Sequence, residues 1–354
     1  MKIRIEKNQN PKPKPQDESK LGFGKIFTDH MFIMNYDEGE GWHDPRIVPY
    51  APLKLEPSAM CLHYAQEAFE GLKAYRGVDG KIRLFRPDKN MARLNSSNAR
   101  LCAPLLSEKD ALDAIKQLVA MDADWIPRAQ GTSLYIRPFV IGIDPMVGVH
   151  PARHLLFMII LSPVGAYYPE GLNPVSIFVE NEYVRSVRGC LGHTKAAANY
   201  AASLKAQEEA VQKGFTQVLW LDGVQRKYIE EVGTMNVFFV LEEGVVTPSL
   251  DGSILPGITR MSVIELLRSW GVAVTQRKIS IDELESAYKA GKLIEAFGSG
   301  TAAVISPIGS LCSGTDKMII NRGEIGELSR KLYDRLTGIQ WGRVPDTFGW
   351  TVEL

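Results

Sequence analysis

The stretch GHTKAAANYAASLKAQEEA, residues 192–210, places Lys195 directly before three alanines and close to two more. Alanine is the strongest helix former, so the pattern predicts a helix from residue 196 to about 213, followed by a strand at 217–221. Small side chains leave room beside the lysine for a bulky group. Partial burial of a lysine also favours the neutral form of its amine, which is the form that attacks a carbonyl. Taken alone, a lysine at the start of a helix is ordinarily solvated, so the neighbouring motifs decide.

The length and the pattern outside this stretch indicate two α/β domains. A chain of 354 residues exceeds one ordinary hydrophobic core. The segment GAYYPEGLNP at 165–174 has the composition of a connection. Before it, strand-like runs at 82–85 and 133–140 alternate with helical spacing at 90–101 and 108–121, and after it come strands at 175–179 and from about 228 to 246. The predicted parts are a flexible arm at 1–20, a small α/β domain at 21–164, an interdomain loop at 165–174 and a large domain at 175–354.

Composition excludes several classes of protein. The 41 basic residues balance 41 acidic ones, which argues against a nucleic-acid or membrane-surface partner. The four scattered cysteines favour neither disulfides nor a zinc site, so we expect no bound metal. The lack of a disulfide pattern also predicts a reducing compartment, and hence a cytoplasmic location. The apolar run at 155–161 is too short to span a bilayer and predicts a buried strand. The polar residues 2–20 do not resemble a signal peptide.

Three further segments carry chemistry. YIEEVGTMNVFFV, residues 228–240, sets two glutamates before a Gly-Thr turn and an apolar strand, where a carboxylate needs a partner unless it lies at an exposed edge. LPGITR at 255–260 precedes a predicted helix, and FGSGTAA at 297–303 is a glycine-rich turn. Backbone N–H groups at such turns bind phosphate. Each signal is weak alone, and neither is a Walker or Rossmann fingerprint.

Taken in order, GHTKAAANY, EVGTMN, LPGITR and FGSGTA resemble the class IV, fold-type IV pyridoxal-phosphate transaminases, and specifically the branched-chain aminotransferase family. FTDHM at 27–31, HYAQEAFEGLKAY at 63–75, LFRPDKNMARL at 84–94 and SLYIRP at 133–138 are also similar. The resemblance covers nearly the whole chain after residue 20. It implies an α/β (α+β) fold of two domains, a small α/β sandwich and a larger pseudo-barrel.

The resemblance also implies the residues that hold pyridoxal 5′-phosphate. Lys195 would carry the cofactor as a Schiff base and move the substrate α-proton. Tyr200 would bond the phenolic oxygen, and Glu231 rather than Glu230 would keep the ring nitrogen protonated, which maintains the ring as an electron sink. Read without the family, Tyr200 is an aromatic packed at a domain interface. The phosphate would be bound by Arg93, Ile258, Thr259 and Thr301, although Arg93 by itself reads as a surface residue of an amphipathic helix.

The substrate pocket must accept both a branched alkyl group and the γ-carboxylate of 2-oxoglutarate. Arg137 with Tyr135 is suited to the carboxylate, because an arginine makes charge-assisted hydrogen bonds. The resemblance assigns the remaining contacts to Phe23, Tyr64, Tyr167, Thr234, Thr301 and Ala302, with Val147 and Val149 supplied by the partner subunit of a homodimer. Core packing is the alternative role for the aromatic residues, and His193 is interpreted as structural.

The predicted function is transamination between L-leucine, L-isoleucine or L-valine and 2-oxoglutarate. A D-amino-acid transaminase or an aminodeoxychorismate lyase of the same fold is the alternative, against which the YIR sequence at 135–137 argues. A catalytically silent relative would be expected to lack some of the cofactor residues. A nucleotide-binding α/β protein would need a Walker lysine or a GxGxxG after a strand.

Overall fold

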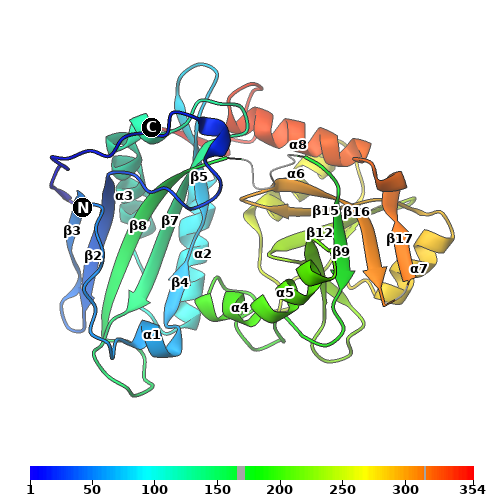
Figure 1. Cartoon of the computed structure of the whole chain (residues 1–354), viewed down its shortest axis with the longest axis horizontal. Helices are drawn as coiled ribbons and strands as arrows, with labels where there is room; N and C mark the ends of the chain where they lie inside the picture. The colour runs from blue at the N-terminus through cyan, green and yellow to red at the C-terminus, as the bar shows by residue number, and fades with distance from the viewer. Residues whose placement is uncertain (166–171, 315) are drawn as a thin grey trace. The chain divides into compact units, whose positions relative to one another are not determined.

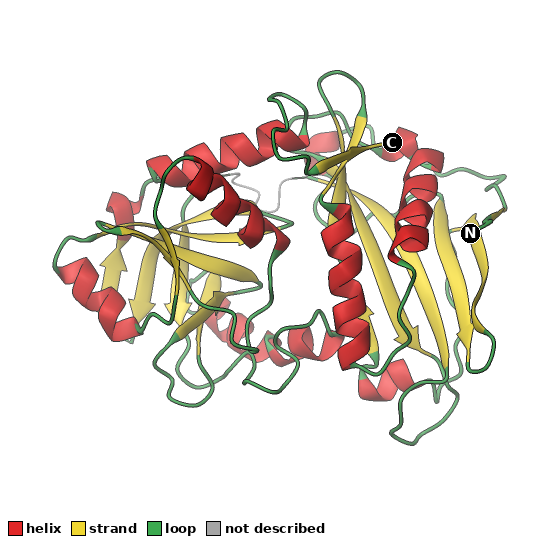
Figure 2. Ribbon diagram, turned by 180° about the vertical axis from the view of Figure 1, so that it is seen from behind, coloured by secondary structure: helices red, strands yellow, loops and turns green. Residues whose placement is uncertain are grey.

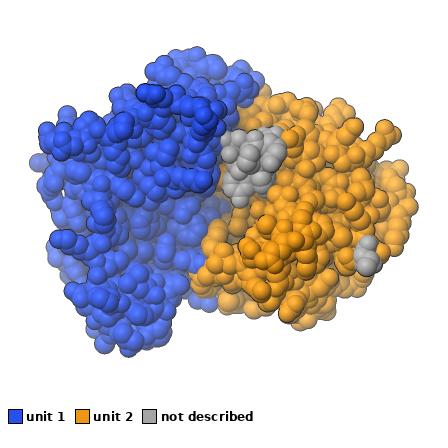
Figure 3. All heavy atoms as spheres, viewed as in Figure 1, with its two compact units in different colours: residues 1–169, 194–197, 338–354 blue, residues 170–193, 198–337 orange. Residues whose placement is uncertain are grey.

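A computed structural model describes residues 1–165, 172–314 and 316–354 (Figure 1). The chain divides into two compact units, which Figure 3 colours separately. Unit 1 comprises Met1–Pro169, Thr194–Ala197 and Gly338–Leu354, and unit 2 comprises Glu170–His193 and Ala198–Thr337.

Unit 1 is built on a sheet in the order β1-β3-β2-β8-β7-β5-β6-β18, with β4 paired to β7. Most neighbouring strands run antiparallel, while β1 lies parallel to β3. Its strands are β1 (Arg4–Ile5), β2 (His30–Asp37), β3 (Gly41–Pro49), β4 (Glu67–Phe69), β5 (Leu72–Arg76), β6 (Ile82–Phe85), β7 (Ser133–Gly142), β8 (His154–Val164) and β18 (Thr351–Glu353). The predicted strands at 82–85 and 133–140 are confirmed, and the apolar run at 155–161 lies inside β8.

Two long helices cover one face of this sheet, as Figure 2 shows from behind. The helical elements are η1 (Glu18–Lys20), α1 (Met60–Tyr64), α2 (Pro87–Arg100), α3 (Glu108–Met121) and η2 (Ala123–Trp125). The helix predicted at 108–121 is therefore confirmed. It begins where the Ser107 side chain accepts a hydrogen bond from the Asp110 amide, which is a typical N-cap. Ile115 and Leu118 of α3 are fully buried in a core that continues under α2 and the sheet.

The N-terminal segment, for which a flexible arm is predicted, makes specific contacts with the rest of unit 1. β1 pairs with β3, and the amide of Asn8 donates to Nε2 of His30 over 2.9 Å. Lys12 donates its amide to Asp29 and its Nζ to the carbonyl of Thr28, at 2.8 and 2.9 Å. These contacts are hydrogen bonds, which a polar, proline-rich composition does not reveal.

The sheet of unit 2 closes on itself. β11 pairs with β10 on one side and β12 on the other, so the strands β11-β10-β9-β16-β15-β12 form a six-stranded barrel. The predicted pseudo-barrel is thus confirmed. The strands of this unit are β9 (Val175–Val179), β10 (Gln217–Leu221), β11 (Ile229–Val232), β12 (Met235–Leu241), β13 (Gly244–Thr247), β14 (Val274–Gln276), β15 (Leu293–Gly300), β16 (Val304–Ser313) and β17 (Asp316–Ile319). Phe238 of β12 and Phe297 of β15 are fully buried and stack, with their ring centroids 5.1 Å apart.

The helix predicted from residue 196 to 213 is interrupted. α4 (Ala197–Ala202) and α5 (Leu204–Gln212) are separated at Ser203, whose hydroxyl donates to the carbonyl of Tyr200 over 2.8 Å. A serine that bonds the preceding turn in this way competes with the helical ladder. The other helices are α6 (Ile258–Ser269), α7 (Ile281–Lys289), η3 (Ile320–Gly323) and α8 (Glu327–Gln340).

The C-terminal segment differs from its predicted place. The sequence assigned everything from 175 onward to the large domain, whereas residues from Gly338 to Leu354 cluster with unit 1. The reason is strand pairing, because β18 adds to the edge of the unit 1 sheet beside β6. Within the part of the chain that the structure describes, no helix has both the length and the apolar character needed to cross a membrane.

Candidate active site

Lys195 is fixed by its backbone to β4 and α2 of unit 1. Its amide donates to Oγ of Ser97 over 3.0 Å, and its carbonyl accepts from the amide of Phe69 over 3.0 Å. Ala196, the next residue, is fully buried and forms a β-bridge with Ala68. The Lys195 ammonium lies 4.8 Å from the centroid of the Phe69 ring. Ala196 thus packs its backbone against β4, and the lysine is half-buried, while the room for a bulky group that the small side chains predict stays a prediction.

Arg93 is buried, which corrects the reading of an isolated surface arginine. It is 9% exposed in α2, and its Nε and Nη2 atoms donate to the two carboxylate oxygens of Glu70 over 2.7 and 3.0 Å. Asn90, one helical turn earlier, donates to the same carboxylate over 2.7 Å. Such two-point contact between a guanidinium and a carboxylate fixes the direction of both groups.

Glu70 is completely buried and remains ionised because of these partners. Burial opposes its charge, but the nearby Arg93 and Lys195 charges and the hydrogen bonds from Arg93 and Asn90 hold the pKa of Glu70 below its ordinary value. The side chains of Arg93 and Lys195 thus belong to one electrostatic group in unit 1.

Tyr135 and Arg137 lie together on β7, as residues two apart on one face of a strand must. Nη2 of Arg137 donates to the Tyr135 hydroxyl over 3.0 Å, and the Arg137 guanidinium carbon lies 4.6 Å from the Phe69 ring centroid. Phe23 contacts Tyr135 edge-on, at 4.9 Å between centroids. Gly71 is needed here, because a Cβ at this position would lie 2.0 Å from the Tyr135 hydroxyl oxygen.

Three further predicted residues of unit 1 lie in α1 and in the loop after β7, and a fourth falls outside the described residues. Tyr64 ends the short helix α1 and is half-buried. Val147 and Val149 lie in the loop between β7 and β8 and are 70% and 78% exposed. Tyr167 falls in the segment 166–171, which is outside the described residues.

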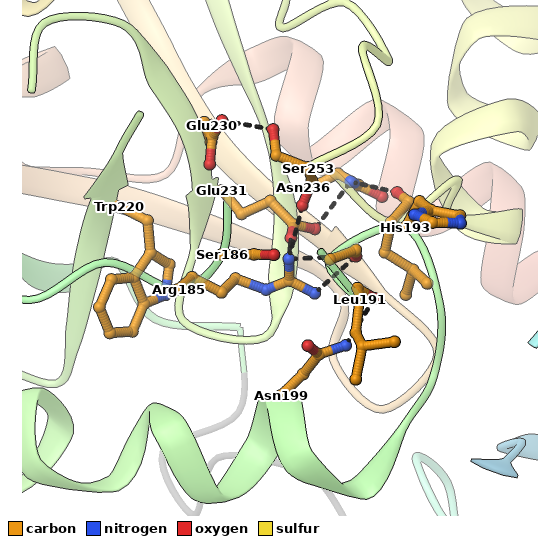
Figure 4. Close-up of polar contacts among 12 residues, drawn as sticks. Arg185, Ser186, Leu191, His193, Asn199, Trp220, Glu230, Glu231, Asn236 and Ser253 are labelled. Carbon is orange, nitrogen blue, oxygen red and sulfur yellow. Dashed lines mark hydrogen bonds and ion pairs between the residues drawn. The ribbon is translucent and has the colours of Figure 1, made fainter. Parts of the chain in front are cut away.

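In unit 2, the two glutamates of β11 are both buried but have different partners (Figure 4). Oε2 of Glu231 lies 2.8 Å from Nη1 of Arg185, and its Oε1 accepts from the Asn236 amide over 3.0 Å. Glu230 instead accepts a hydrogen bond from the hydroxyl of Ser253. Burial raises the pKa of Glu230, and the Ser253 hydrogen bond only partly opposes this. The alternative of an exposed edge glutamate is therefore wrong for both residues.

The predicted phosphate cradle is the start of α6. Gly257 is its N-cap residue, and Ile258 and Thr259 are the first two helical residues. Among the residues that the structure describes, no side chain caps this end, and the first turn contains no acidic residue. An uncapped helix N-terminus with glycine before it presents backbone N–H groups that suit an anion.

The other predicted residues of unit 2 lie on α4 and in two turns. Thr301 and Ala302 form the turn between β15 and β16 and are half-buried, whereas Thr234 is exposed in the turn after β11. Tyr200, on α4, lines a cavity of about 280 Å³ that includes its opening to solvent. The cavity is lined by Arg185, Asn199, Tyr200, Ser203, Gly233, Thr234 and Leu255. His193 faces the Gly252 carbonyl, with Nδ1 3.2 Å from the oxygen, which is consistent with a structural role.

Sequence reasoning missed four residues that hold the predicted ones in place: Phe69, Glu70, Arg185 and Asn236. Phe69 and Glu70 lie in the HYAQEAFEGLKAY segment, and Asn236 lies in EVGTMN. A search of these segments for a side chain that could bond Arg93 or Glu231 would have found Glu70 and Asn236 as candidates. The sequence gives no such signal for Arg185, because this residue lies in a loop outside all of the quoted motifs.

Comparison with known proteins places the chain in a family. Residues 67–311 match the model of the amino-transferase class IV family. The chain is 58% identical to branched-chain-amino-acid aminotransferase 2 of Bacillus subtilis, covering 99% of this chain and 97% of that protein. It is 50% identical to the branched-chain-amino-acid aminotransferase of Mycobacterium tuberculosis, covering 98% and 96%.

Solved structures agree with these relatives. The T.th. branched-chain amino acid aminotransferase with pyridoxamine 5′-phosphate superposes with a TM-score of 0.75 at 26% identity, over 90% of this chain and 97% of that one. The Escherichia coli branched-chain amino acid aminotransferase gives a TM-score of 0.71 at 25% identity, over 92% and 98%. Three features of the structure accompany this similarity. They are the closed barrel, the buried Glu231 that begins the EVGTMN motif, and the uncapped N-terminus of α6. The chain belongs to the class IV aminotransferases and, within them, to the branched-chain aminotransferase family.

Proposed function

We propose that Lys195 is the catalytic residue of a branched-chain amino acid aminotransferase, which exchanges the amino group between L-leucine, L-isoleucine or L-valine and 2-oxoglutarate. The observation that carries the function is the 58% identity, over 99% of the chain, to an aminotransferase of that name. The choice of Lys195 is supported by its place beside Phe69 and Glu70 and by the hydrogen bonds that fix its backbone in unit 1.

The cofactor is pyridoxal 5′-phosphate, and the chemical groups of this chain fit it. When bound, it supplies an electron sink for the carbanion formed at the substrate α-carbon. The uncapped N-terminus of α6 suits its phosphate, with the amides of Ile258 and Thr259 as donors. Arg93 and Thr301 would complete the phosphate contacts, and Tyr200 would bind the phenolic oxygen. Glu231, whose carboxylate is buried beside a cation, suits a protonated ring nitrogen.

Lys195 would act at its Nζ atom. This amine accepts the α-proton of the bound amino acid and later returns it, so it must alternate between charged and neutral forms. Glu70 accepts hydrogen bonds from Arg93, Asn90 and the Gly71 amide, and its negative charge near Lys195 balances the ammonium form. The Phe69 ring, 4.8 Å from Nζ, limits access of water on that side.

Substrate selection would rest on the β7 pair and the surrounding aromatic side chains. Arg137, joined to the Tyr135 hydroxyl, offers a cation and a phenol to the γ-carboxylate of 2-oxoglutarate. Phe23 and Phe69 lie against this pair and provide apolar surface for a branched alkyl group. The substrate carboxylate would be bound by Tyr64 and by the amides of Thr301 and Ala302, and Thr234 and Tyr167 complete the proposed set.

Two finer aspects belong to the same proposal. The enzyme would act as a homodimer in which Val147 and Val149 extend into the partner subunit's pocket, and their 70% and 78% exposure in the single chain leaves them available. A cytoplasmic location is inferred because all four cysteines are free, as a reducing compartment maintains.

Turnover of three substrates tests this function. The purified enzyme should transaminate L-leucine with 2-oxoglutarate much faster than D-alanine, and it should release no product from aminodeoxychorismate. A preference for either of the last two would overturn the substrate assignment in favour of the related activities of the fold. Retention of the cofactor without turnover of any of the three would indicate a catalytically silent relative.

A further inference from the structure

Adjacent glutamates on β11 bond different side chains of one polar cluster, shown in Figure 4. Residues next to each other in a strand point to opposite faces, so the two carboxylates accept hydrogen bonds from different groups, although the charge of Arg185 acts on both. The side chain of Glu230 meets Ser253. Glu231, 2% exposed, instead faces a buried arginine that no sequence motif indicated. The surroundings of this arginine suggest a role beyond packing.

Arg185 is held by carbonyl groups of two other segments. Its side chain is 8% exposed. Nη1 donates to the carbonyl of Ser253 over 2.9 Å and to that of Gly192 over 3.2 Å, and Nη2 also donates to Gly192 over 3.2 Å. These contacts direct the guanidinium toward Glu231, with Nη1 and Oε2 2.8 Å apart. Backbone carbonyls thus fix the cation before any ligand arrives.

The second oxygen of Glu231 is also held in place, by Asn236 of the neighbouring strand β12. Asn236 also contacts the segment that precedes α6. Nδ2 of Asn236 donates to Oε1 of Glu231 over 3.0 Å and to the carbonyl of Leu255 over 2.9 Å. Leu255 precedes Gly257, the N-cap of α6. The carboxylate of Glu231 therefore has its orientation set on both oxygens, by a cation on one side and an amide on the other.

The charged groups near Glu231 favour its ionised form. Arg185 is in contact, and the charge of Arg260 also acts on Glu231, although the Arg260 guanidinium is turned to the carbonyl of Pro248 and the amide of Gln276. The neighbouring acids, Asp251 and Asp222, act on Glu230, and so does the charge of Arg185. A buried carboxylate without a cation takes up a proton, because desolvation penalises its charge.

We propose that Arg185 is a positioning residue that keeps Glu231 ionised and correctly oriented, so that Glu231 can hold the proton of the cofactor's ring nitrogen. This rests on the proposed cofactor role of Glu231. Arg185 itself touches neither substrate nor cofactor in this scheme, since it acts through the carboxylate. Without it, Glu231 loses the cation in contact with Oε2 and the group that orients this oxygen, which makes it a poorer partner for a pyridinium.

The experiment compares Arg185→Gln, Arg185→Lys and the control Arg188→Gln, which changes an exposed arginine of the same loop. Each holoenzyme is titrated from low to high pH while its visible cofactor band is recorded, and the dissociation constant of pyridoxal 5′-phosphate is measured by fluorescence. Arg185→Gln should weaken cofactor binding by about 10- to 100-fold and move the titration midpoint of the band. Arg185→Lys should recover part of both effects, and Arg188→Gln should match the wild type.

A double-mutant cycle with Glu231→Gln separates positioning from simple folding. If Arg185 acts through Glu231, then Arg185→Gln should add little to the loss of affinity in the Glu231→Gln background. Full additivity, or an unchanged band and affinity in a folded Arg185→Gln enzyme, would overturn the proposal. Should Arg185→Gln fail to fold, the Arg185→Lys enzyme and its cycle with Glu231→Gln decide by the same criteria. A wild type that binds no cofactor, or a Glu231→Gln enzyme equal to the wild type, would instead contradict the proposed function.

Discussion

The carboxylate of Glu70 and the guanidinium of Arg93 meet along one edge in the interior of unit 1, with Nε 2.7 Å from Oε1 and Nη2 3.0 Å from Oε2. The pair joins the end of β4 to the middle of α2 and includes Asn90. Because its members are buried, each depends on the other for compensation of its charge. The phosphate-binding role proposed for Arg93 therefore requires an intact Glu70.

Glu70→Gln should destabilise the protein by about 3–5 kcal/mol near neutral pH, since it leaves the Arg93 charge buried without a counter-ion. The pKa of Glu70 is lower in the folded chain than its ordinary value of 4.5. The stability from its charge is therefore complete above pH 4.5 and is lost as the pH falls through the folded pKa. Urea unfolding of both proteins at several pH values measures the difference, which should shrink below pH 4.5.

The control for this experiment is Asp88→Asn, which removes an exposed carboxylate from the first turn of the same helix. We expect it to cost less than about 1 kcal/mol, because only its weak interaction with the helix end is lost. An equal loss in the two variants, or a Glu70→Gln deficit that grows toward acid pH, would contradict the account of the pair.

Gly257→Ala should weaken cofactor binding without straining the backbone. Gly257 has φ −67°, which any residue accepts, but an added Cβ would lie 2.0 Å from Oδ1 of Asn236. Asn236 must then move, and with it the amide that binds Glu231. We expect roughly a tenfold or greater increase in the dissociation constant for pyridoxal 5′-phosphate, measured by equilibrium dialysis. In Gly165→Ala, the new Cβ meets atoms only at 3.8–4.0 Å, so affinity should be unchanged.

Arg137→Met should affect the two half-reactions unequally. The variant removes the cation beside Tyr135 but keeps much of the apolar volume. The kcat/KM for 2-oxoglutarate should fall by about 10- to 100-fold, which corresponds to a lost charged hydrogen bond, while that for L-leucine should change far less. Stopped-flow measurement of each half-reaction gives both values. Arg153→Met, at a side chain 63% exposed, is the control, and an equal decline for both substrates would argue against the proposed role of Arg137.

Local pattern was sufficient for much of the fold but not for the partners of the site residues. Helix α3 and strand β9 were predictable because their apolar spacing reflects one packed face. The break at Ser203 was not, since it depends on one serine hydroxyl. The burial of Arg93 became visible only with Glu70, which is 23 residues away in sequence and joins it through tertiary packing. Similarly, nothing near Arg185 in sequence announces its contact with Glu231.

The most direct test of the central claim is the visible absorption spectrum of the purified enzyme and of Lys195→Ala, each recorded before and after addition of L-leucine. The wild type should be yellow and its band should collapse with L-leucine, because the amine of Lys195 holds the cofactor and then moves the α-proton. Lys195→Ala should lack this response and should transaminate L-leucine at a negligible rate. If the wild type is yellow and Lys195→Ala still turns over L-leucine at an unchanged rate, Lys195 is not the catalytic residue.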